Sequence, residues 1–226
     1  LNDDGNLVRT INTSDFTGGS GGGVQEVAHD GTVIWEFIYD DATHLSHHDI
    51  ALMPNGNILL VAWEFMTPAD AIAAGRNPAL VSGSVFAADS VIEIAPDGAG
   101  GADIVWEWRV WDHLVQDTDE ELDNFGEVAE HPELVNVNFS ARDGGDWNHT
   151  NAINYNAKLD QIVLGVPTFS EIWILDHSTT TALAAGHAGG RSGKGGDLLY
   201  RWGNPQAYRA GTAANRKLFF QHDAHW

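Results

Sequence analysis

The chain repeats one pattern of four short β-rich segments, and this repeat most strongly limits how it can fold. In each copy a histidine-bearing segment is followed by three apolar runs that are separated by turn residues. The first copy spans residues 47–108 and the second spans residues 149–202. Four-stranded units repeated along a chain are typical of a β-propeller, in which each unit forms one blade. The repeat therefore predicts an all-β chain made of four-stranded propeller blades.

The apolar runs are rich in Val, Ile, Leu and Trp, and sequences such as Asn-Gly and Asp-Gly lie between them, as in antiparallel hairpins. The predicted strands are 33–38, 57–63, 91–94, 104–108, 161–164, 171–175 and 198–202. A short helix is expected over residues 69–75. The glycine-rich stretch 186–196 lacks the spacing of a phosphate-binding P-loop. We expect it to be a flexible or tightly turned loop with weak anion-binding potential through Arg191 and Lys194.

We expect residues 1–226 to form a single partial propeller domain that covers roughly half of a ring. The expected divisions are 1–40 (end of one blade), 47–110 (a blade), 111–146 (an acidic loop between blades), 147–205 (a blade) and 219–226 (start of the next blade). A closed propeller needs about 4–8 blades. The chain is therefore expected to be a fragment; the alternatives are that a homo-oligomer or a further polypeptide completes the ring.

The charge and the cysteine content exclude several classes of function. Eleven Lys and Arg against 32 Asp and Glu give a net charge of −21, which repels phosphate backbones and anionic membranes. No nucleic-acid or membrane partner is therefore expected, and no apolar run approaches the ~18 residues of a membrane span. Because the chain has no cysteine, disulfides, thiolate metal sites and cysteine nucleophiles are excluded. The acidity suits a saline or extracellular setting.

Eleven histidines are unusual in a chain with so few basic residues, and several recur where the first strand of a blade begins. First strands line the central channel of a propeller, so residues at this shared position converge on the axis. The expected cluster consists of His48, His149 and His222, with His47, Asn151 and His225 as its neighbours.

Converging imidazoles support three kinds of chemistry. A neutral ring nitrogen can act as a nucleophile, a ring can exchange protons as acid and base, or His48, His149 and His222 together can bind a transition metal. In the simplest interpretation each ring only forms hydrogen bonds to the backbone. The acidic segment 117–123 leaves calcium binding open, although it lacks the glycine and the final Glu of an EF-hand loop.

Three short segments resemble the signature motifs of the arylsulfotransferase family. They are His-His-Asp-Ile with Pro-Asn-Gly-Asn (47–57), Asp-Trp-Asn-His-Thr-Asn (146–151) and Gln-His-Asp (221–223). The longer runs 171–180 and 195–205 resemble one bacterial branch of that family. The similarity extends over nearly the whole chain, with the three motifs in the correct order.

The resemblance implies a six-bladed propeller in an exported enzyme, periplasmic or extracellular, that needs no cofactor. Such enzymes move a sulfuryl group from a phenolic sulfate to a phenol without PAPS, through a sulfohistidine. By position, His222 matches the nucleophile, and His48 and His149 match the histidines that bind sulfate oxygens and assist the leaving phenolate. Asn151 matches a sulfate-oxygen donor. The neighbours His47 and His225 are also candidates for substrate binding.

One departure from the family pattern is serious. The family has an arginine at the end of the strand that follows the His149 strand, whereas this chain has Pro167 there. Arg142, Arg191 and Arg209 are the candidates to replace it from loops, because a neutral group does not reproduce the bidentate grip of arginine on sulfate. Three hypotheses stay open: a sulfuryl transferase, a metal-binding propeller and a non-catalytic propeller.

Overall fold

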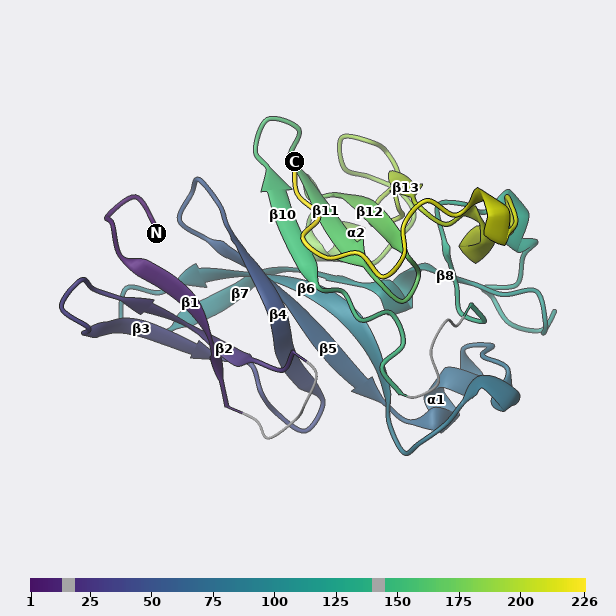
Figure 1. The fold of residues 1–226 in the computed structure, drawn as a ribbon, viewed down its shortest axis with the longest axis horizontal. Helices are drawn as coiled ribbons and strands as arrows, with labels where there is room; N and C mark the ends of the chain where they lie inside the picture. Colours follow the sequence, from purple (N-terminus) through teal and green to yellow (C-terminus); the bar gives the residue numbers. More distant parts are fainter. Residues whose placement is uncertain (14–18, 140–144) are drawn as a thin grey trace.

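The structure, a computed structural model, describes residues 1–13, 19–139 and 145–226. Within these ranges the strands form three antiparallel sheets and one short parallel pair, with few helices (Figure 1). The prediction of an all-β chain is therefore confirmed, whereas closure into a propeller stays a prediction. No helix among the described residues is both long enough and apolar enough to span a membrane.

The three antiparallel sheets follow one another along the chain, and each has its strands in sequence order. The first contains β1 (Leu7–Asn12), β2 (Gly22–Val27) and β3 (Val33–Ile38). The second contains β4 (His44–Leu52), β5 (Ile58–Met66), β6 (Phe86–Pro96) and β7 (Ala102–Arg109). The third contains β10 (Ala152–Asn156), β11 (Gln161–Val166), β12 (Glu171–Asp176) and β13 (Tyr200–Trp202). The two repeats therefore form two four-stranded sheets.

Short helical segments occupy the connections. The α-helices are α1 (Pro68–Ala73) and α2 (Thr181–Ala184). The 3-10 helices are η1 (Pro78–Leu80), η2 (Val110–His113), η3 (Val128–Glu130), η4 (Pro205–Tyr208) and η5 (Ala213–Asn215). Helix α1 begins at a capping box in which Thr67 and Asp70 bond reciprocally, so the expected short helix has a local cause.

The turn chemistry explains how the strands pair. In the β4–β5 hairpin Gly56 has a φ of 88°, and the Met53 amide donates to Asn57 O at 2.9 Å. A residue with a Cβ is strained at that φ, so the Asn-Gly sequence specifies the turn. The hairpin then pairs Leu52 with Ile58 and places Leu59 and Val61 in the core.

Large aromatic side chains fill the space between the second and third sheets. Trp108, Trp147, Phe169 and Trp173 are all buried in one continuous apolar cluster. Their ring nitrogens also have partners: Trp108 Nε1 donates to Gly196 O at 2.7 Å, and Trp147 Nε1 donates to Phe139 O at 2.9 Å. Bulky rings with satisfied polar atoms hold the two sheets at a defined separation.

The segment 111–146, expected as an acidic loop, is ordered and packed over its described part. It contains β8 (Leu114–Val115), paired in parallel with β9 (Val135–Asn136). Val128, Val135 and Val137 are fully buried, which explains why the segment packs on the sheets instead of extending into solvent. The carboxylates proposed for calcium have protein partners: Asp117 pairs with Arg209, and Asp119 accepts from the Glu121 amide.

The C-terminal residues 219–226 have no regular secondary structure, but they lie along the third sheet (Figure 1). Asn151 Nδ2 donates to Gln221 O at 3.1 Å, and Gln221 Nε2 donates to Glu171 O at 2.6 Å. Side-chain bonds therefore hold the segment that carries His222 against β10 and β12.

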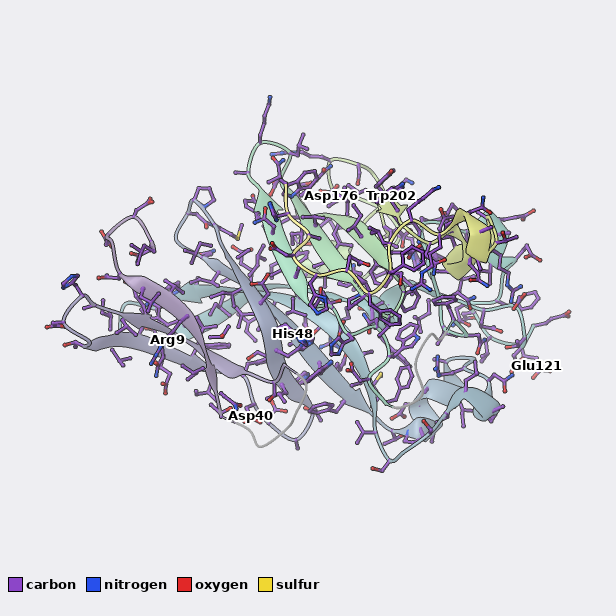
Figure 2. All side chains as sticks on the ribbon, in the orientation of Figure 1. Arg9, Asp40, His48, Glu121, Asp176 and Trp202 are labelled. Carbon is purple, nitrogen blue, oxygen red and sulfur yellow. The ribbon has the colours of Figure 1, made fainter. Side chains whose placement is uncertain are left out.

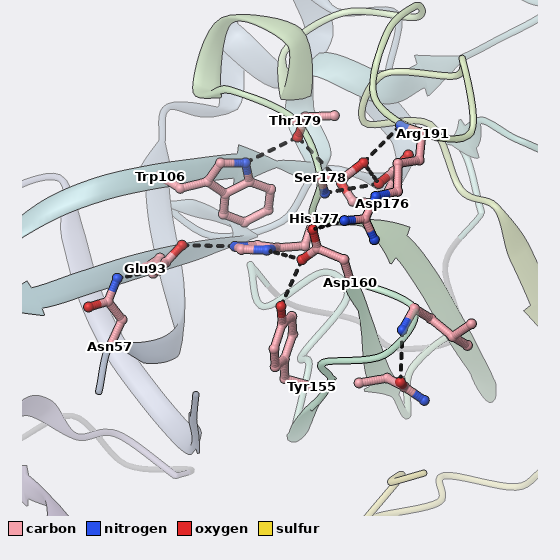
Figure 3. Close-up of polar contacts among 12 residues, drawn as sticks. Asn57, Glu93, Trp106, Tyr155, Asp160, Asp176, His177, Ser178, Thr179 and Arg191 are labelled. Carbon is pink, nitrogen blue, oxygen red and sulfur yellow. Dashed lines mark hydrogen bonds and ion pairs between the residues drawn. The ribbon is translucent and has the colours of Figure 1, made fainter. Parts of the chain in front are cut away.

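A partly buried histidine joins the second and third sheets on the side shown in Figure 3. His177 Nε2 lies 2.8 Å from Glu93 Oε2, and His177 Nδ1 lies 2.9 Å from Asp160 Oδ1. Burial alone would lower the pKa of His177, but the bonds to the two carboxylates outweigh it and raise the pKa. The same bonds lower the pKa of Glu93 and Asp160, although burial opposes this.

Stability is expected to depend on pH through this contact. The contribution of His177 is fully present below its unfolded pKa and is lost as pH rises through its raised folded pKa. The contribution of Glu93 and Asp160 is present above their unfolded pKa and is lost as pH falls through their lowered folded values. Tyr155, which donates to Asp160, does not titrate in this range because burial and Asp160 raise its pKa to about 12.

We expect the melting temperature of wild type to exceed that of His177→Gln. The difference should be largest at pH values between the lowered pKa values of Glu93 and Asp160 and the raised pKa of His177. Melting temperatures recorded from about pH 3 to about pH 9 should show the difference shrinking at both ends. Arg191 lies 3.7 Å from Asp160, so Arg191→Gln is the control for a neighbouring exposed charge; it should leave the pH profile nearly unchanged. A difference between wild type and His177→Gln that is constant with pH would contradict the assignment.

Candidate active site

A β-bulge in β4 directs three consecutive side chains to different places. The pairing of β4 with β5 shifts between Ser46 and Ile50, and His48 has a φ of 53°. Bulges re-aim side chains and are frequent beside active sites. Here His47 points into the protein, His48 points toward the third sheet, and Asp49 accepts the Ile153 amide at 3.0 Å. Figure 2 labels His48 near the centre of the molecule.

His47 is buried between an aromatic ring and a carboxylate. Its ring stacks on Trp63 with centroids 4.0 Å apart and an interplanar angle of 12°. Its Nε2 lies 3.3 Å from Asp89 Oδ1, and its Nδ1 lies 2.8 Å from Nδ1 of His48. His47 therefore contacts His48 from the interior of the protein, and its own ring has almost no exposed surface that a substrate could reach.

His48 and His149 meet at the edge between the second and third sheets. Their ring centroids are 4.6 Å apart in a T-shaped contact. Burial, together with the nearby His47, His149 and His222, lowers the pKa of His48 to about 4, although Asp146 opposes the shift. His48 is therefore a neutral imidazole near neutral pH.

His149 lies just before β10 with a φ of 52°, and a carboxylate orients its ring. Asp146 Oδ2 contacts His149 Nδ1, while Asp146 Oδ1 accepts from Trp63 Nε1 at 3.1 Å. An ionised carboxylate can only accept hydrogen bonds, so Nδ1 of His149 carries a proton. Asp146 is a site residue that sequence reasoning missed, although the Asp-x-x-His spacing was the available signal.

The remaining predicted residues lie on or against the C-terminal segment. Asn151 is buried, and its Oδ1 has no hydrogen-bond partner among the described residues. His222 is exposed, and its Nδ1 lies 3.1 Å from Phe220 O. His222 lies near enough to contribute to the lowered pKa of His48. His225 is exposed and contacts Asp223 O at 3.1 Å, so its described contacts are local.

The arginines proposed to replace the family arginine are placed elsewhere or lie outside the described residues. Arg191 lies near Asp160, Arg209 pairs with Asp117, and Arg142 falls outside the described ranges. Pro167 sits in the β11–β12 turn, where its carbonyl accepts from the Ser170 amide at 2.9 Å.

Arg216 is the arginine that contacts this turn. Its guanidinium donates to Ser170 Oγ and lies 4.8 Å from the ring centroid of Phe219 and 5.5 Å from that of Phe220. It therefore packs on the segment that leads to His222. Sequence reasoning missed this residue because no motif surrounds it.

A glycine makes room for His48. Gly19 has a φ of 89°, and a Cβ built there would lie 2.2 Å from His48 Cε1. Gly19→Ala is therefore expected to displace His48 and to lower activity by about 10–100-fold, since small misplacements of reacting groups have effects of this size. Gly31→Ala is the matched control, because Gly31 has a φ of 90° and no atom of the described residues lies within 4 Å of its Cβ position. Equal activity of the two variants in a steady-state assay would show that His48 tolerates the shift.

The fold and the site together define an all-β protein with a histidine cluster between neighbouring four-stranded sheets. The profile of the family described as Arylsulfotransferase (ASST) matches residues 2–183, so the chain belongs to the arylsulfotransferase family. That range includes His48, His149 and Asn151 and ends before His222.

Curated proteins and solved structures provide two further comparisons. No curated protein matches the chain. Among solved structures, hydrazine synthase of Kuenenia stuttgartiensis is similar at 14% identity and a TM-score of 0.45, over 89% of this chain and 47% of that chain. The chain thus spans about half the length of that structure.

Proposed function

We propose that this chain carries the active site of a PAPS-independent sulfuryl transferase that uses His222 as its nucleophile. The observation that carries the proposal is the contact of His222 Nδ1 with Phe220 O at 3.1 Å. A carbonyl oxygen can only accept, so Nδ1 must carry the proton. In a neutral ring Nε2 then holds the free electron pair, as a nucleophilic histidine requires.

In the first half-reaction, Nε2 of His222 attacks the sulfur of a phenolic sulfate. The N–S bond forms while the S–O bond to the phenol breaks. In the proposed step His149 is protonated on both ring nitrogens; Asp146 orients it at Nδ1, and the departing phenolate takes the proton from Nε2. The products are a sulfohistidine on His222, a free phenol and a neutral His149.

In the second half-reaction, an acceptor phenol gives its proton to Nε2 of His149 and attacks the sulfur. The N–S bond breaks, and its electron pair returns to His222 Nε2. His149 is again protonated, so the cycle closes without a cofactor. His48, which is neutral because its pKa is about 4, provides a hydrogen bond to the sulfuryl oxygens. The Asn151 amide holds Gln221, and its second N–H is the other donor.

We propose export of the enzyme to the periplasm or beyond, where phenolic sulfates and phenols would be its partners. Metal binding by His48, His149 and His222 is less well supported. Within the described part of the chain, the one set of three His, Asp or Glu ligand atoms that lie within 4.8 Å of one another is at a different place.

The experiment uses the longest polypeptide that contains these residues. The protein is incubated with 4-nitrophenyl sulfate, with and without phenol, and nitrophenolate release is followed. Release that depends on phenol is the expected result. Folded protein that releases no nitrophenolate with excess donor would contradict the proposal and favour a non-catalytic propeller, consistent with Pro167 at the arginine position.

A further inference from the structure

Two histidines and one aspartate converge away from the candidate active site. His113 ends η2, whereas His187 and Asp197 belong to the segment between α2 and β13. Asp197 Oδ1 lies 2.8 Å from His113 Nδ1 and 2.7 Å from His187 Nδ1. In the described ranges, this is the one set of three such ligand atoms that fits within 4.8 Å.

The hydrogen bonding of His113 leaves a lone pair aimed at a carboxylate. Nε2 of His113 lies 2.8 Å from Ala184 O, and a carbonyl only accepts, so Nε2 carries a proton. In the neutral ring, Nδ1 is then an acceptor that faces Asp197 Oδ1, which is also an acceptor. Two acceptors at this distance need a proton or a cation between them. His113 is completely buried, so a bound cation at this position would be largely shielded from bulk water on the His113 side.

The surroundings of His113 hold its ring rigidly. The ring stacks on Trp108 with centroids 5.6 Å apart and an interplanar angle of 6°. Trp108 Nε1 donates to Gly196 O, and a Cβ on Gly196 would lie 2.6 Å from His113 Nε2. A histidine whose outer N–H is bonded to a backbone carbonyl and whose plane is fixed matches the usual support of a metal ligand.

We propose that His113 Nδ1, His187 Nδ1 and Asp197 Oδ1 bind a Zn²⁺ ion. Imidazole and carboxylate donors in a set of three suit zinc, whereas calcium and magnesium prefer oxygen ligands alone. Tetrahedral zinc, with bonds of about 2.0–2.2 Å, places its ligand atoms roughly 3.3 Å apart. Asp197 Oδ1 and each of the two imidazole nitrogens must therefore separate by about 0.5 Å on binding. The side chain of His187 is 60% exposed on a glycine-rich segment and can make this adjustment.

The ion would connect η2, which follows the second sheet, with the segment that leads to the last strand of the third sheet. The fourth zinc position would face solvent on the His187 side. His187 also lines a cavity of ≈ 330 Å³ with Trp111, Asp112 and Leu134, so water or a small ligand can reach this position. The glycine-rich stretch 186–196 thereby gains a role in metal binding.

The test uses protein without an affinity tag, stripped with EDTA and titrated with ZnCl₂. We expect one equivalent of zinc to bind by calorimetry, and the melting temperature to rise by about 5–10 °C at a hundredfold excess over Kd. MgCl₂ at the same concentration should produce no shift. Failure of wild type to bind zinc would overturn the proposal and leave a proton between His113 and Asp197.

Variants assign the binding to these residues. His187→Ala removes an exposed ligand with little risk to the fold and should weaken zinc binding by at least about 100-fold, more than the loss of an outer-shell partner. His131→Ala is the matched control, because His131 lines the same cavity but contacts Glu133. Zinc binding that persists in His187→Ala, or that is lost in His222→Ala instead, would refute the assignment.

Discussion

Replacement of His222 by alanine should lower aryl-sulfate turnover by at least about 10³-fold while the protein stays folded. Loss of a catalytic nucleophile has effects of this size or larger, because the remaining groups cannot form the covalent intermediate. The fold should persist, since His222 is exposed and the adjoining segment is held by Gln221 and Asn151. Nitrophenolate release under steady-state conditions measures the effect.

A second measurement separates the nucleophile from a supporting residue. Wild type incubated with donor and no acceptor should accumulate one sulfuryl group on the peptide that contains His222, detectable by mass spectrometry. His29→Ala is the control, because His29 is exposed near the β2–β3 turn, and it should retain turnover. An adduct on another residue, or near-normal turnover by His222→Ala, would refute the assigned role.

Replacement of Glu171 by alanine should reduce the free energy of unfolding by about 3–5 kcal/mol, the usual cost of leaving a buried charge without its partner. Glu171 is fully buried, and its carboxylate accepts from Arg201 Nε at 3.1–3.2 Å and from Trp173 Nε1 at 2.8 Å. Burial raises the pKa of Glu171, and Arg201 opposes this shift. Urea unfolding followed by fluorescence gives the difference.

The double variant Glu171→Leu with Arg201→Met is the control for this prediction. It removes both charges and keeps a similar volume, so it should recover most of the lost stability. Gln221 Nε2 donates to the main-chain oxygen of Glu171, which both variants retain, so the segment that carries His222 should stay anchored. A loss below about 1 kcal/mol in Glu171→Ala would mean that water reaches Arg201 and solvates it.

Local patterns in the sequence predicted most strands. The predicted strand 33–38 coincides with β3, and 161–164 lies within β11 (Gln161–Val166). In contrast, β1 and β2 were read only as the end of an earlier unit. Strand β2 begins with Gly22-Gly23, which resembles a turn, but a Cβ on Gly23 would lie 2.6 Å from Phe37 O. Gly23 is needed because β2 packs closely against β3 at this position. No local sequence pattern reveals that contact.

The candidate site was predictable only in part. The repeat predicted that His48 and His149 would approach each other, and the structure places their rings 4.6 Å apart. It did not predict the orienting role of Asp146 or the position of Arg216. The cluster of His113, His187 and Asp197 was equally hidden, since Asp197 and His113 are 84 positions apart.

The sequence by itself determined the all-β class, the two four-stranded units and the histidines that begin them. These properties depend on apolar periodicity and turn residues, which act over a few neighbouring positions. Only the tertiary structure decided which ring nitrogen of each site histidine faces which carboxylate or carbonyl oxygen. The β4 bulge turns His47 inward and His48 toward His149, and a one-residue shift in pairing would reverse these directions. Such choices depend on long-range packing, so the chemistry of the site appears only once the sheets are in contact.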